Sequence, residues 1–346
     1  MTISRRLTKK IKVGNIFIGG DAPITVQTMV KADAHDVDAV VKQILETEKY
    51  GCDITRMGVL DMESVKNFGK IKKQIHIPIV ADIHFDYKLA LEAIRQGVDK
   101  LRINPGNIGD ISKTREVVNL AKKYKVPIRI GINGGSLEKD LPLSPKGLVE
   151  SATRHIRILE DLNYDQILVS LKTSDIKMTM EAYELFSKKY DYPVHVGITE
   201  AGTNYSGTIK SSIGIGSLLL KGIGDTIRVS LTSNPVDEVK AGLEILKQLN
   251  IRKDSPVLVS CPTCSRTQYD MMPLATKVEE FLLTIKKPIK VAVMGCVVNG
   301  PGEAREADCG VAGGKNCGVL FVKGKVTKTV PEKDMFEELK NLINQL

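Results

Sequence analysis

The sequence predicts an α/β fold in which a TIM (β/α)8 barrel is followed by a small α/β domain. Three observations favour it: eight short β-branched runs, segments of helical periodicity between them, and a polar stretch near residue 250 that ends the repeat. Strands that alternate with helices pair in parallel, and eight such units over roughly 250 residues is the size of a TIM barrel. We therefore expect the barrel over residues 1–250 and the second domain over residues 251–346.

The expected strands of the barrel are Ile24–Val30, Asp53–Val59, Ile77–Ile83, Lys100–Asn104, Pro127–Asn133, Gln166–Lys172, Pro193–Thr199 and Asp225–Leu231. The helices between them include Val37–Tyr50, Tyr87–Gly97, Ile111–Tyr124, Gly147–Leu162 and Met178–Tyr190, and a last helix runs from Pro235 to Leu249. A doubly wound open sheet is the alternative. It normally carries a Gly-rich nucleotide loop after its first strand, and Gln27–Val30 supplies none. We interpret Gly214, Gly216, Gly222 and Gly224 as helix breaks.

The two ends of the chain add smaller elements. Lys10–Gly19 alternates about a Gly14-Asn15 pair, which predicts a two-residue hairpin that caps the elements after it. Beyond the polar segment Asn250–Pro256, the second domain is expected to contain two strands, two helices and a hairpin about Gly324-Lys325. The strands are Val257–Ser260 and Lys290–Met294, and the helices are Pro273–Lys286 and Glu332–Gln345.

Composition limits the class of function. No run approaches the ~18 apolar residues of a membrane span, and the basic N-terminus lacks the apolar segment of an export signal. We therefore expect a cytoplasmic protein with no membrane partner, whose six cysteines are thiols and metal ligands. The net charge of +9 is spread over helices without an aromatic-basic motif, which indicates anionic substrates or an acidic protein partner and no nucleic acid.

Cysteines in the second domain predict a metal site. Cys261 and Cys264 form a Cys-x-x-Cys turn, and Cys296 lies between an apolar run and a Gly/Pro-rich loop that can wrap around an ion. A fourth ligand could come from Glu303, Cys309 or Cys317. Zinc ribbons usually pair two Cys-x-x-Cys motifs, whereas three thiolates on an iron–sulfur cluster leave one iron open to a substrate. The asymmetry favours iron–sulfur, and spacing alone leaves zinc and the fourth ligand open.

Alternation along the strands predicts which side chains enter the barrel. Aliphatic residues of one parity face the helices, and the polar residues of the other parity face inward: Asp82, His84, Arg102, Asn104, Arg129, Asn133, Lys172, Arg228 and Ser230, with Arg56 if Ile54 is also inward. Burying an unpaired charge costs several kcal/mol, and Asp82 is the obvious anion among five cations. We expect a pocket at the C-terminal mouth for a ligand with two or more phosphate charges; internal salt bridges are the alternative.

Glu200 lies in the loop that follows the seventh expected strand, where catalytic groups of TIM barrels typically sit. Beside the inward cations it is a candidate proton donor or electrostatic partner. An ordinary surface carboxylate is the alternative.

Seven motifs together are highly specific: Ala81–His84, Lys100–Asn107, Gly131–Ser136, Gly197–Gly202, Gly222–Ser230, Cys261–Cys264 and Gly295–Glu303. On them the chain resembles, over essentially its whole length, the 4-hydroxy-3-methylbut-2-enyl diphosphate synthases of the non-mevalonate isoprenoid pathway in their short bacterial form. One departure is Ser265, where the family usually has Gly; it replaces no ligand.

The resemblance implies a small α/β iron–sulfur cluster domain with a four-iron four-sulfur (4Fe-4S) centre held by Cys261, Cys264, Cys296 and Glu303. It implies reductive ring opening and dehydroxylation of 2-C-methyl-D-erythritol 2,4-cyclodiphosphate, with single electrons from flavodoxin or ferredoxin. The substrate would be held by Arg56, Arg102, Arg129, Asn133, Lys172, Arg228 and Ser230, and Glu200 would be the acid near the departing hydroxyl. The rival hypothesis is a zinc-knuckle barrel protein that binds a diphosphate ligand or RNA without redox chemistry.

Chain length predicts a homodimer. The last barrel helix delivers the chain to the N-terminal face of the barrel, away from the mouth. Residues 250–256 reach at most about 25 Å when extended, and the climb past ~15-residue helices alone takes about 22 Å. Almost no length is left for the lateral distance, so we expect that the second domain does not cover the mouth of its own barrel. The resemblance also implies a homodimer in which each cluster domain covers the partner's barrel.

Overall fold

Eight parallel strands, in the hydrogen-bonded order β8-β7-β6-β5-β4-β3-β10-β9, form the wall of a barrel. They are β3 (Thr25–Met29), β4 (Ile54–Gly58), β5 (Ile79–Asp82), β6 (Lys100–Ile103), β7 (Ile128–Asn133), β8 (Ile167–Lys172), β9 (His195–Val196) and β10 (Thr226–Ile227). A parallel bridge between Val169 and Val194 joins the two ends of the sheet. The structure is a computed structural model that describes residues 3–253, 255–285, 287–296, 302 and 304–346.

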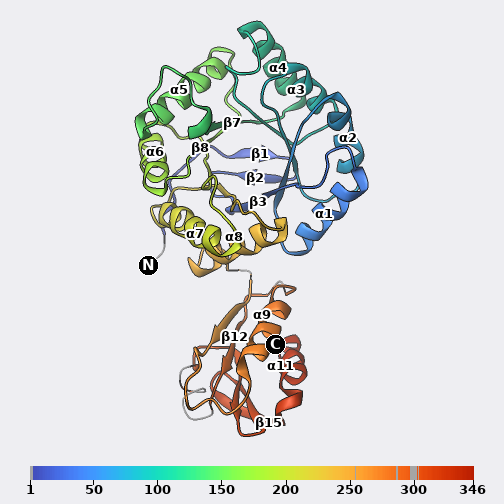
Figure 1. The fold of residues 1–346 in the computed structure, drawn as a ribbon, viewed down its shortest axis with the longest axis vertical. Helices are drawn as coiled ribbons and strands as arrows, with labels where there is room; N and C mark the ends of the chain where they lie inside the picture. Colours follow the sequence, from blue (N-terminus) through green and yellow to red (C-terminus); the bar gives the residue numbers. More distant parts are fainter. Residues whose placement is uncertain (1–2, 254, 286, 297–301, 303) are drawn as a thin grey trace. The chain divides into compact units, whose positions relative to one another are not determined.

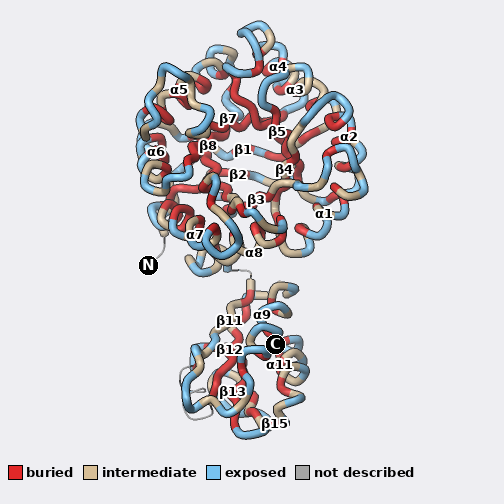
Figure 2. The backbone as a smooth tube through the Cα atoms, in the orientation of Figure 1, coloured by how far each residue is buried: buried red, intermediate tan, exposed pale blue. Residues whose placement is uncertain are grey.

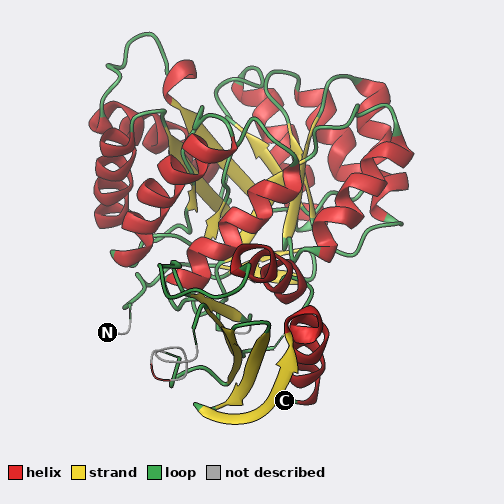
Figure 3. Cartoon of the chain, turned by 60° about the horizontal axis from the view of Figure 1, so that its bottom comes forward, coloured by secondary structure: helices red, strands yellow, loops and turns green. Residues whose placement is uncertain are grey.

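A helix follows each strand, and the helices surround the barrel (Figures 1 and 3). They are α1 (Val37–Lys49), α2 (Met62–Lys72), α3 (Tyr87–Arg95), α4 (Ile111–Tyr124), α5 (Pro145–Asp161), α6 (Ile176–Lys189), α7 (Asn204–Leu220) and α8 (Pro235–Gln248). Figure 2 shows the strands buried and the outer helix faces exposed. The predicted TIM barrel is confirmed, and none of the described helices is long and apolar enough to cross a membrane.

Polar residues set where the helices begin. Asp61 accepts a hydrogen bond from the backbone nitrogen of Ser64 at 2.8 Å, and the Ser64 hydroxyl accepts one from the backbone of Asp61, which completes a capping box for α2. Asn234 caps α8 and Pro235 fills its first position, where a missing N–H costs nothing. Each cap lies just after a strand and so turns the chain back along the barrel.

Two expectations about the later barrel units are wrong. β9 and β10 are two residues long. Gly197 follows β9 directly, and a Cβ there would lie 2.5 Å from the Arg228 carbonyl oxygen and 2.8 Å from Lys172 Nζ, so only glycine fits at this position. Gly214 and Gly216 do not break a helix but lie inside α7. A Cβ at Gly214 would lie 2.6 Å from Ile198, so this glycine allows α7 to pack closely on the barrel wall.

A hairpin closes the N-terminal end of the barrel. β1 (Ile11–Val13) and β2 (Ile16–Ile18) pair antiparallel about Gly14, whose φ of +57° is left-handed, as the sequence predicted. Buried side chains of the hairpin form one cluster with Ile54, Val80 and Leu168, which come from the first halves of their strands. Figure 1 shows both strands across the barrel interior. The hairpin therefore seals the barrel from below, and the opposite mouth stays available for a site.

The second unit, Arg252–Leu346, is a five-stranded sheet with helices on it. Its strands β11 (Val257–Ser260), β12 (Lys290–Met294) and β13 (Cys309–Gly314) are parallel, and β14 (Cys317–Val322) and β15 (Lys325–Pro331) continue it antiparallel. Side chains of α9 (Met271–Leu282) and α11 (Met335–Gln345), which follows the 3-10 turn Glu332–Asp334, share its core. The sequence did not predict β13, whose three glycines weaken the strand signal.

We predict that Ile18→Ala will lower the free energy of unfolding of the barrel by about 2 to 5 kcal/mol, because it leaves a cavity under the sheet. Denaturant unfolding followed by circular dichroism measures the change. Phe17→Ala is the matched control: its side chain is exposed in the same strand, and we expect a loss below about 1 kcal/mol. Equal losses would show that the hairpin does not seal the barrel.

Candidate functional site

Five cations enter the barrel interior from separate strands or from the residue that follows one: Arg56, Arg102, Arg129, Lys172 and Arg228. Residues paired across a parallel ladder point the same way, so the register of Arg102 with Asp82 and Arg129, and of Lys172 with Asn133, places these side chains on one face. Arg102, Arg129 and Lys172 are at most 5% exposed. Burial, the largest cause, lowers the pKa of Arg56 to about 10; Asp82 opposes it, and Arg228 and Arg102 add to it.

Asp82 neutralises part of this charge. Its carboxylate oxygens lie 3.2 Å from an Arg102 nitrogen and 3.5 Å from Arg56 Nε. Burial raises the pKa of Asp82, but Arg56, Arg102 and Arg129 together hold it below its ordinary value, so it is ionised at neutral pH. Both ring nitrogens of His84 lie 3.2–3.3 Å from Arg102, and burial with nearby Arg102 lowers the pKa of His84 against the pull of Asp82.

Arg102 is fixed by its backbone surroundings. Its second terminal nitrogen donates to the Gly131 carbonyl oxygen at 2.8 Å, and the Gly131 nitrogen donates to the Asn104 side-chain oxygen at 3.0 Å. A Cβ at Gly131 would lie 2.2 Å from Arg102 Nε, so only glycine leaves room for the guanidinium. The paired cation is thus held in one orientation before any ligand binds.

Arg129 and Lys172 have no carboxylate partner among the described residues. Arg129 donates to Ser170 Oγ at 3.1 Å, but its Nε and other terminal nitrogen are buried without a hydrogen bond. Burial, followed by Arg129 and Arg56, holds the pKa of Lys172 well below its usual range. Buried donors are almost always satisfied in native proteins, so this part of the barrel is built for a group that supplies acceptors.

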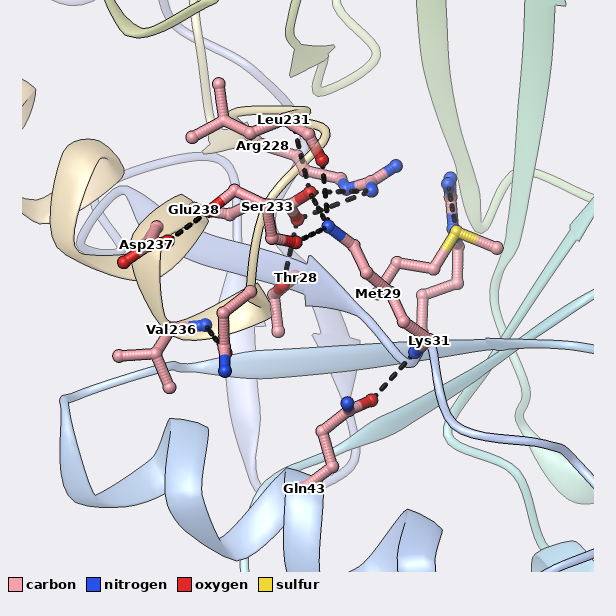
Figure 4. A network of polar contacts seen from close by, with 12 residues as sticks. Thr28, Met29, Lys31, Gln43, Arg228, Leu231, Ser233, Val236, Asp237 and Glu238 are labelled. Carbon is pink, nitrogen blue, oxygen red and sulfur yellow. Dashed lines mark hydrogen bonds and ion pairs between the residues drawn. The ribbon is translucent and has the colours of Figure 1, made fainter. Parts of the chain in front are cut away.

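Sequence reasoning missed Lys100 and Glu238 in the same interior, and it gave His195 an inward position without a functional role. Lys100 and His195 are fully buried, and Lys100 Nζ and His195 Nε2 find no partner in the described chain. Lys100 could have been found, because it has the parity of Arg102 and starts the same strand. Glu238 lies on α8, is 1% exposed, and contacts Arg228 at 3.3 Å (Figure 4). Strand parity gives no information about a helix residue that reaches the mouth.

The remaining predicted barrel residues lie at the C-terminal end of the strands. Asn133 ends β7 and Ser230 follows β10, both half-buried. Glu200 is exposed and its φ of +52° is left-handed, which is uncommon for a non-glycine residue and occurs often at functional sites. The structure places no hydrogen bond or ion pair between Glu200 and the described cations, so it does not bring Glu200 into their cluster.

The cysteines gather at one edge of the second sheet. Cys261 follows β11 and donates its backbone N–H to the Val293 carbonyl oxygen of β12 at 3.1 Å, while Cys296 follows the end of β12. The Cys264 backbone nitrogen donates to Thr267 Oγ1 at 3.2 Å, which closes the turn. Thr263, between Cys261 and Cys264, has a left-handed φ of +63°. The ends of two neighbouring parallel strands therefore carry the three predicted thiol ligands.

The donor set fits a metal centre. Cys261 and Cys296 are half-buried and Cys264 is exposed, whereas Cys309 is buried and burial raises its pKa to about 12. Accessible thiols ionise and bind metal, and a thiol held protonated in the core does not. No group of three His, Cys, Asp or Glu side chains in the described residues is already arranged around a metal position. Glu303, the predicted fourth ligand, lies outside the residues that the structure describes.

Both units match one family. Residues 8–243 match the family model described as the GcpE TIM-barrel domain, and residues 257–345 match the GcpE protein C-terminal domain. The chain belongs to the GcpE family. The resemblance drawn from the motifs is thereby confirmed.

Curated relatives of this GcpE chain carry one name, 4-hydroxy-3-methylbut-2-en-1-yl diphosphate synthase (flavodoxin). The relative from Caldanaerobacter subterraneus subsp. tengcongensis is 55% identical, over 99% of this chain and 98% of that protein. The relative from Clostridium perfringens is 53% identical, over 99% of this chain and 100% of that protein. Among solved structures, dihydropteroate synthase from Stenotrophomonas maltophilia has a TM-score of 0.53 at 13% identity, covering 70% of this chain and 98% of that one, which shows the barrel fold alone.

Tyr269, which the sequence analysis did not single out, joins the halves of the GcpE cysteine edge. The Tyr269 hydroxyl donates to the Met294 carbonyl oxygen at 3.1 Å, two residues before Cys296. A Cβ at Gly313 would lie 1.9 Å from the Tyr269 ring, and a Cβ at Gly295 would lie 2.7 Å from Thr267 Oγ1. Gly295 therefore lets the segment after the Cys-x-x-Cys turn pack directly on the segment that carries Cys296, and Gly313 of β13 leaves room for the Tyr269 ring.

We predict that binding of inorganic pyrophosphate takes up protons. Burial and like charges lower the pKa of Lys172 in the free chain, and an anion beside it raises this pKa again. Affinity should therefore fall as pH rises through the lowered pKa, since the free lysine then loses its charge.

Calorimetry in two buffers of different ionisation enthalpy, from about pH 7 to about 10, measures the uptake. Lys172→Met should remove most of it, whereas Lys100→Met, at the start of its strand and farther from the mouth, should remove less. Because pyrophosphate itself loses protons in this range, the contribution of Lys172 is the difference in uptake between the natural chain and Lys172→Met, and the absence of any difference would contradict the prediction.

Proposed function

We propose that the chain reduces 2-C-methyl-D-erythritol 2,4-cyclodiphosphate to 4-hydroxy-3-methylbut-2-enyl diphosphate by ring opening and dehydroxylation. The observation that carries this proposal is the surplus of buried positive charge in the barrel, where Arg129 and Lys172 lack carboxylate partners among the described residues. The names of the GcpE relatives supply the diphosphate product and flavodoxin. They give no support to a zinc-knuckle protein that binds RNA or a diphosphate without redox chemistry.

The barrel residues bind and orient the substrate. A diphosphate offers several acceptor oxygens, and arginine forks bind phosphate oxygens in pairs. Arg102, already fixed by Asp82 and Gly131, orients the ligand, while Arg129 and Lys172 gain the acceptors that they lack. The remaining contacts of the proposed pocket come from Arg56, Asn133, Arg228 and Ser230.

Glu200 donates the proton that the departing hydroxyl needs in order to leave as water. The position of Glu200 supports this role, because Glu200 follows β9 at the C-terminal end of the barrel. Its left-handed backbone conformation also costs energy, which is common at functional sites. Neutral His84, held against Arg102, positions the guanidinium instead of carrying the proton.

A 4Fe-4S cluster would be held by Cys261, Cys264, Cys296 and Glu303. When bound, it supplies electrons one at a time from the reduced donor. The chain itself holds the thiols at the ends of two neighbouring strands and binds the donor through its excess of basic residues, since flavodoxins and ferredoxins are usually acidic. A carboxylate fourth ligand is more easily displaced than a thiolate, which suits an iron that admits substrate.

We further propose a homodimer in which the cluster domain of one protomer covers the barrel mouth of its partner. Exposed apolar side chains follow four of the barrel strands, in the connecting loop or in the first turn of the next helix: Leu60, Phe85, Leu143 and Tyr205. Met272, beside the cysteine turn, is 68% exposed as well. A second copy of the chain that covers the mouth would remove these apolar side chains from water, which favours the pairing.

Iron content tests the cluster. We expect protein purified without oxygen to be brown with about four iron atoms per chain, and Cys296→Ser to lose the colour. Cys317→Ser is the matched control, a half-buried cysteine that should leave the spectrum unchanged. Stoichiometric zinc without visible absorbance would contradict the proposal.

Mixing two inactive variants tests the shared site. Arg102→Leu removes substrate binding in the barrel and Cys261→Ser removes the cluster, so heterodimers should regain up to about one working site in two. Activity after subunit exchange measures the recovery. Full activity in a strictly monomeric preparation, or no recovery after demonstrated exchange, would exclude a composite site.

A further inference from the structure

A buried carboxylate at the barrel mouth is shared by two cations. Figure 4 shows Glu238 between Arg228, which follows β10, and Lys31, which follows β3. Glu238 Oε1 lies 3.1 Å from Lys31 Nζ and accepts from the Leu231 backbone nitrogen at 3.0 Å. Glu238 Oε2 accepts from Thr28 Oγ1 at 3.0 Å, so both oxygens are held without Arg228.

The two cations use this carboxylate very differently. Lys31 forms an ion pair with Glu238, and its ammonium group donates hydrogen bonds to the Leu231 carbonyl oxygen at 2.8 Å and to that of Ser233. Its backbone nitrogen is fixed as well, since it donates to Gln43 Oε1 at 2.7 Å. Arg228 reaches Glu238 with one terminal nitrogen only, at 3.3 and 3.4 Å, and its buried Nε has no partner in the described chain.

Charge decides what this arrangement does. Two cations share one carboxylate, so the cluster keeps one net positive charge. The Lys31 ammonium is held by Glu238 and by two backbone carbonyl oxygens, whereas Arg228 has a buried Nε without a partner in the described chain and lies close enough to Arg56 to lower the pKa of Arg56. The lysine thus compensates the carboxylate, and the surplus charge rests on the arginine.

We propose that Lys31 is a positioning residue that occupies the charge of Glu238 and thereby leaves Arg228 free to bind a phosphate group of the ligand. The inference rests on the proposed function, because it concerns the same anion pocket. Without Lys31, Glu238 is a buried carboxylate whose nearest cation is Arg228, and it competes with the anion for that guanidinium.

This role predicts an order of affinities that a merely structural role does not. Lys31→Met leaves Glu238 and Arg228 with no net charge between them and should weaken anion binding. Lys31→Met with Glu238→Gln restores one net positive charge and should recover most of the loss. If Lys31 and Glu238 only supported the local fold, the double variant would bind no better than Lys31→Met alone.

The test is calorimetric titration of the full chain, purified without oxygen, with inorganic pyrophosphate. We expect Lys31→Met to weaken binding about tenfold and the double variant to return to within about threefold of the natural chain. Lys31→Arg keeps the charge and should bind nearly as the natural chain does. With the natural substrate, Lys31→Met should raise KM and leave kcat largely unchanged.

Lys72 offers a matched control. Its side chain is 39% exposed against 34% for Lys31, and it pairs at 2.6 Å with Asp99, a largely buried carboxylate at the N-terminal end of β6. Lys72→Met therefore removes the same charge and a similar ion pair at the far end of the barrel. Its pyrophosphate affinity should stay unchanged, since solvent screens such distances.

Each outcome decides a separate point. If Lys31→Met binds as tightly as Lys72→Met, or if the double variant shows no recovery, the inference is wrong. If the double variant does not fold, the contrast between Lys31→Met and Lys31→Arg decides, and equal losses in both overturn it. Arg129→Leu tests the pocket itself. Unchanged pyrophosphate affinity in Arg129→Leu would refute the proposed function. Weakened affinity in Arg129→Leu together with normal affinity in Lys31→Met would refute this inference alone.

Discussion

The site depends on a single constraint: the barrel buries more positive than negative charge. Asp82 serves Arg56 and Arg102, and Glu238 serves Arg228 and Lys31, so the buried carboxylates are already shared. Arg129 and Lys172 then add charge that no described carboxylate balances. An unmatched buried charge costs several kcal/mol, so the free barrel stores unfavourable energy that an anionic ligand relieves. Binding energy and specificity for phosphate both come from this shortage of buried negative charge.

Glycines make this charge density sterically possible. Gly131 leaves space for Arg102, and Gly197 leaves space for Lys172. In an ordinary TIM barrel these inward positions are filled by branched aliphatic residues. Here the aliphatic plug is confined to the lower end, where the hairpin packs on Ile54, Val80 and Leu168. The barrel is therefore sealed below by aliphatic side chains, with Lys100 buried beside Val80, and it is polar and short of negative charge above.

The fold and the inward cations could be predicted because both follow from regular alternation. The period of two along Ile128–Asn133 is enough to turn Arg129 and Asn133 inward. Glu238 was not predicted because it reaches the mouth from a helix, and strand parity gives no information about helix residues. The strand β13 was not predicted because its glycines have a weak strand propensity, which the packing of Gly310 against Phe321 and Ala292 outweighs. Sequence spacing could bring Cys261 and Cys296 into one hypothesis, but only the pairing of β11 with β12 shows that the two segments end side by side.

Both units place their chemistry by the same device. Parallel strands end together, so residues far apart in the sequence meet wherever neighbouring strands stop. In the barrel this brings Lys172 and Asn133 to one edge, and in the second unit it brings Cys261 beside the strand that leads to Cys296. In each case a polar residue from the following segment, Glu238 on α8 or Tyr269 before α9, fixes the edge by hydrogen bonds to the backbone. Mutations in these supporting residues should therefore alter ligand affinity or cluster properties without removing any group that touches the ligand.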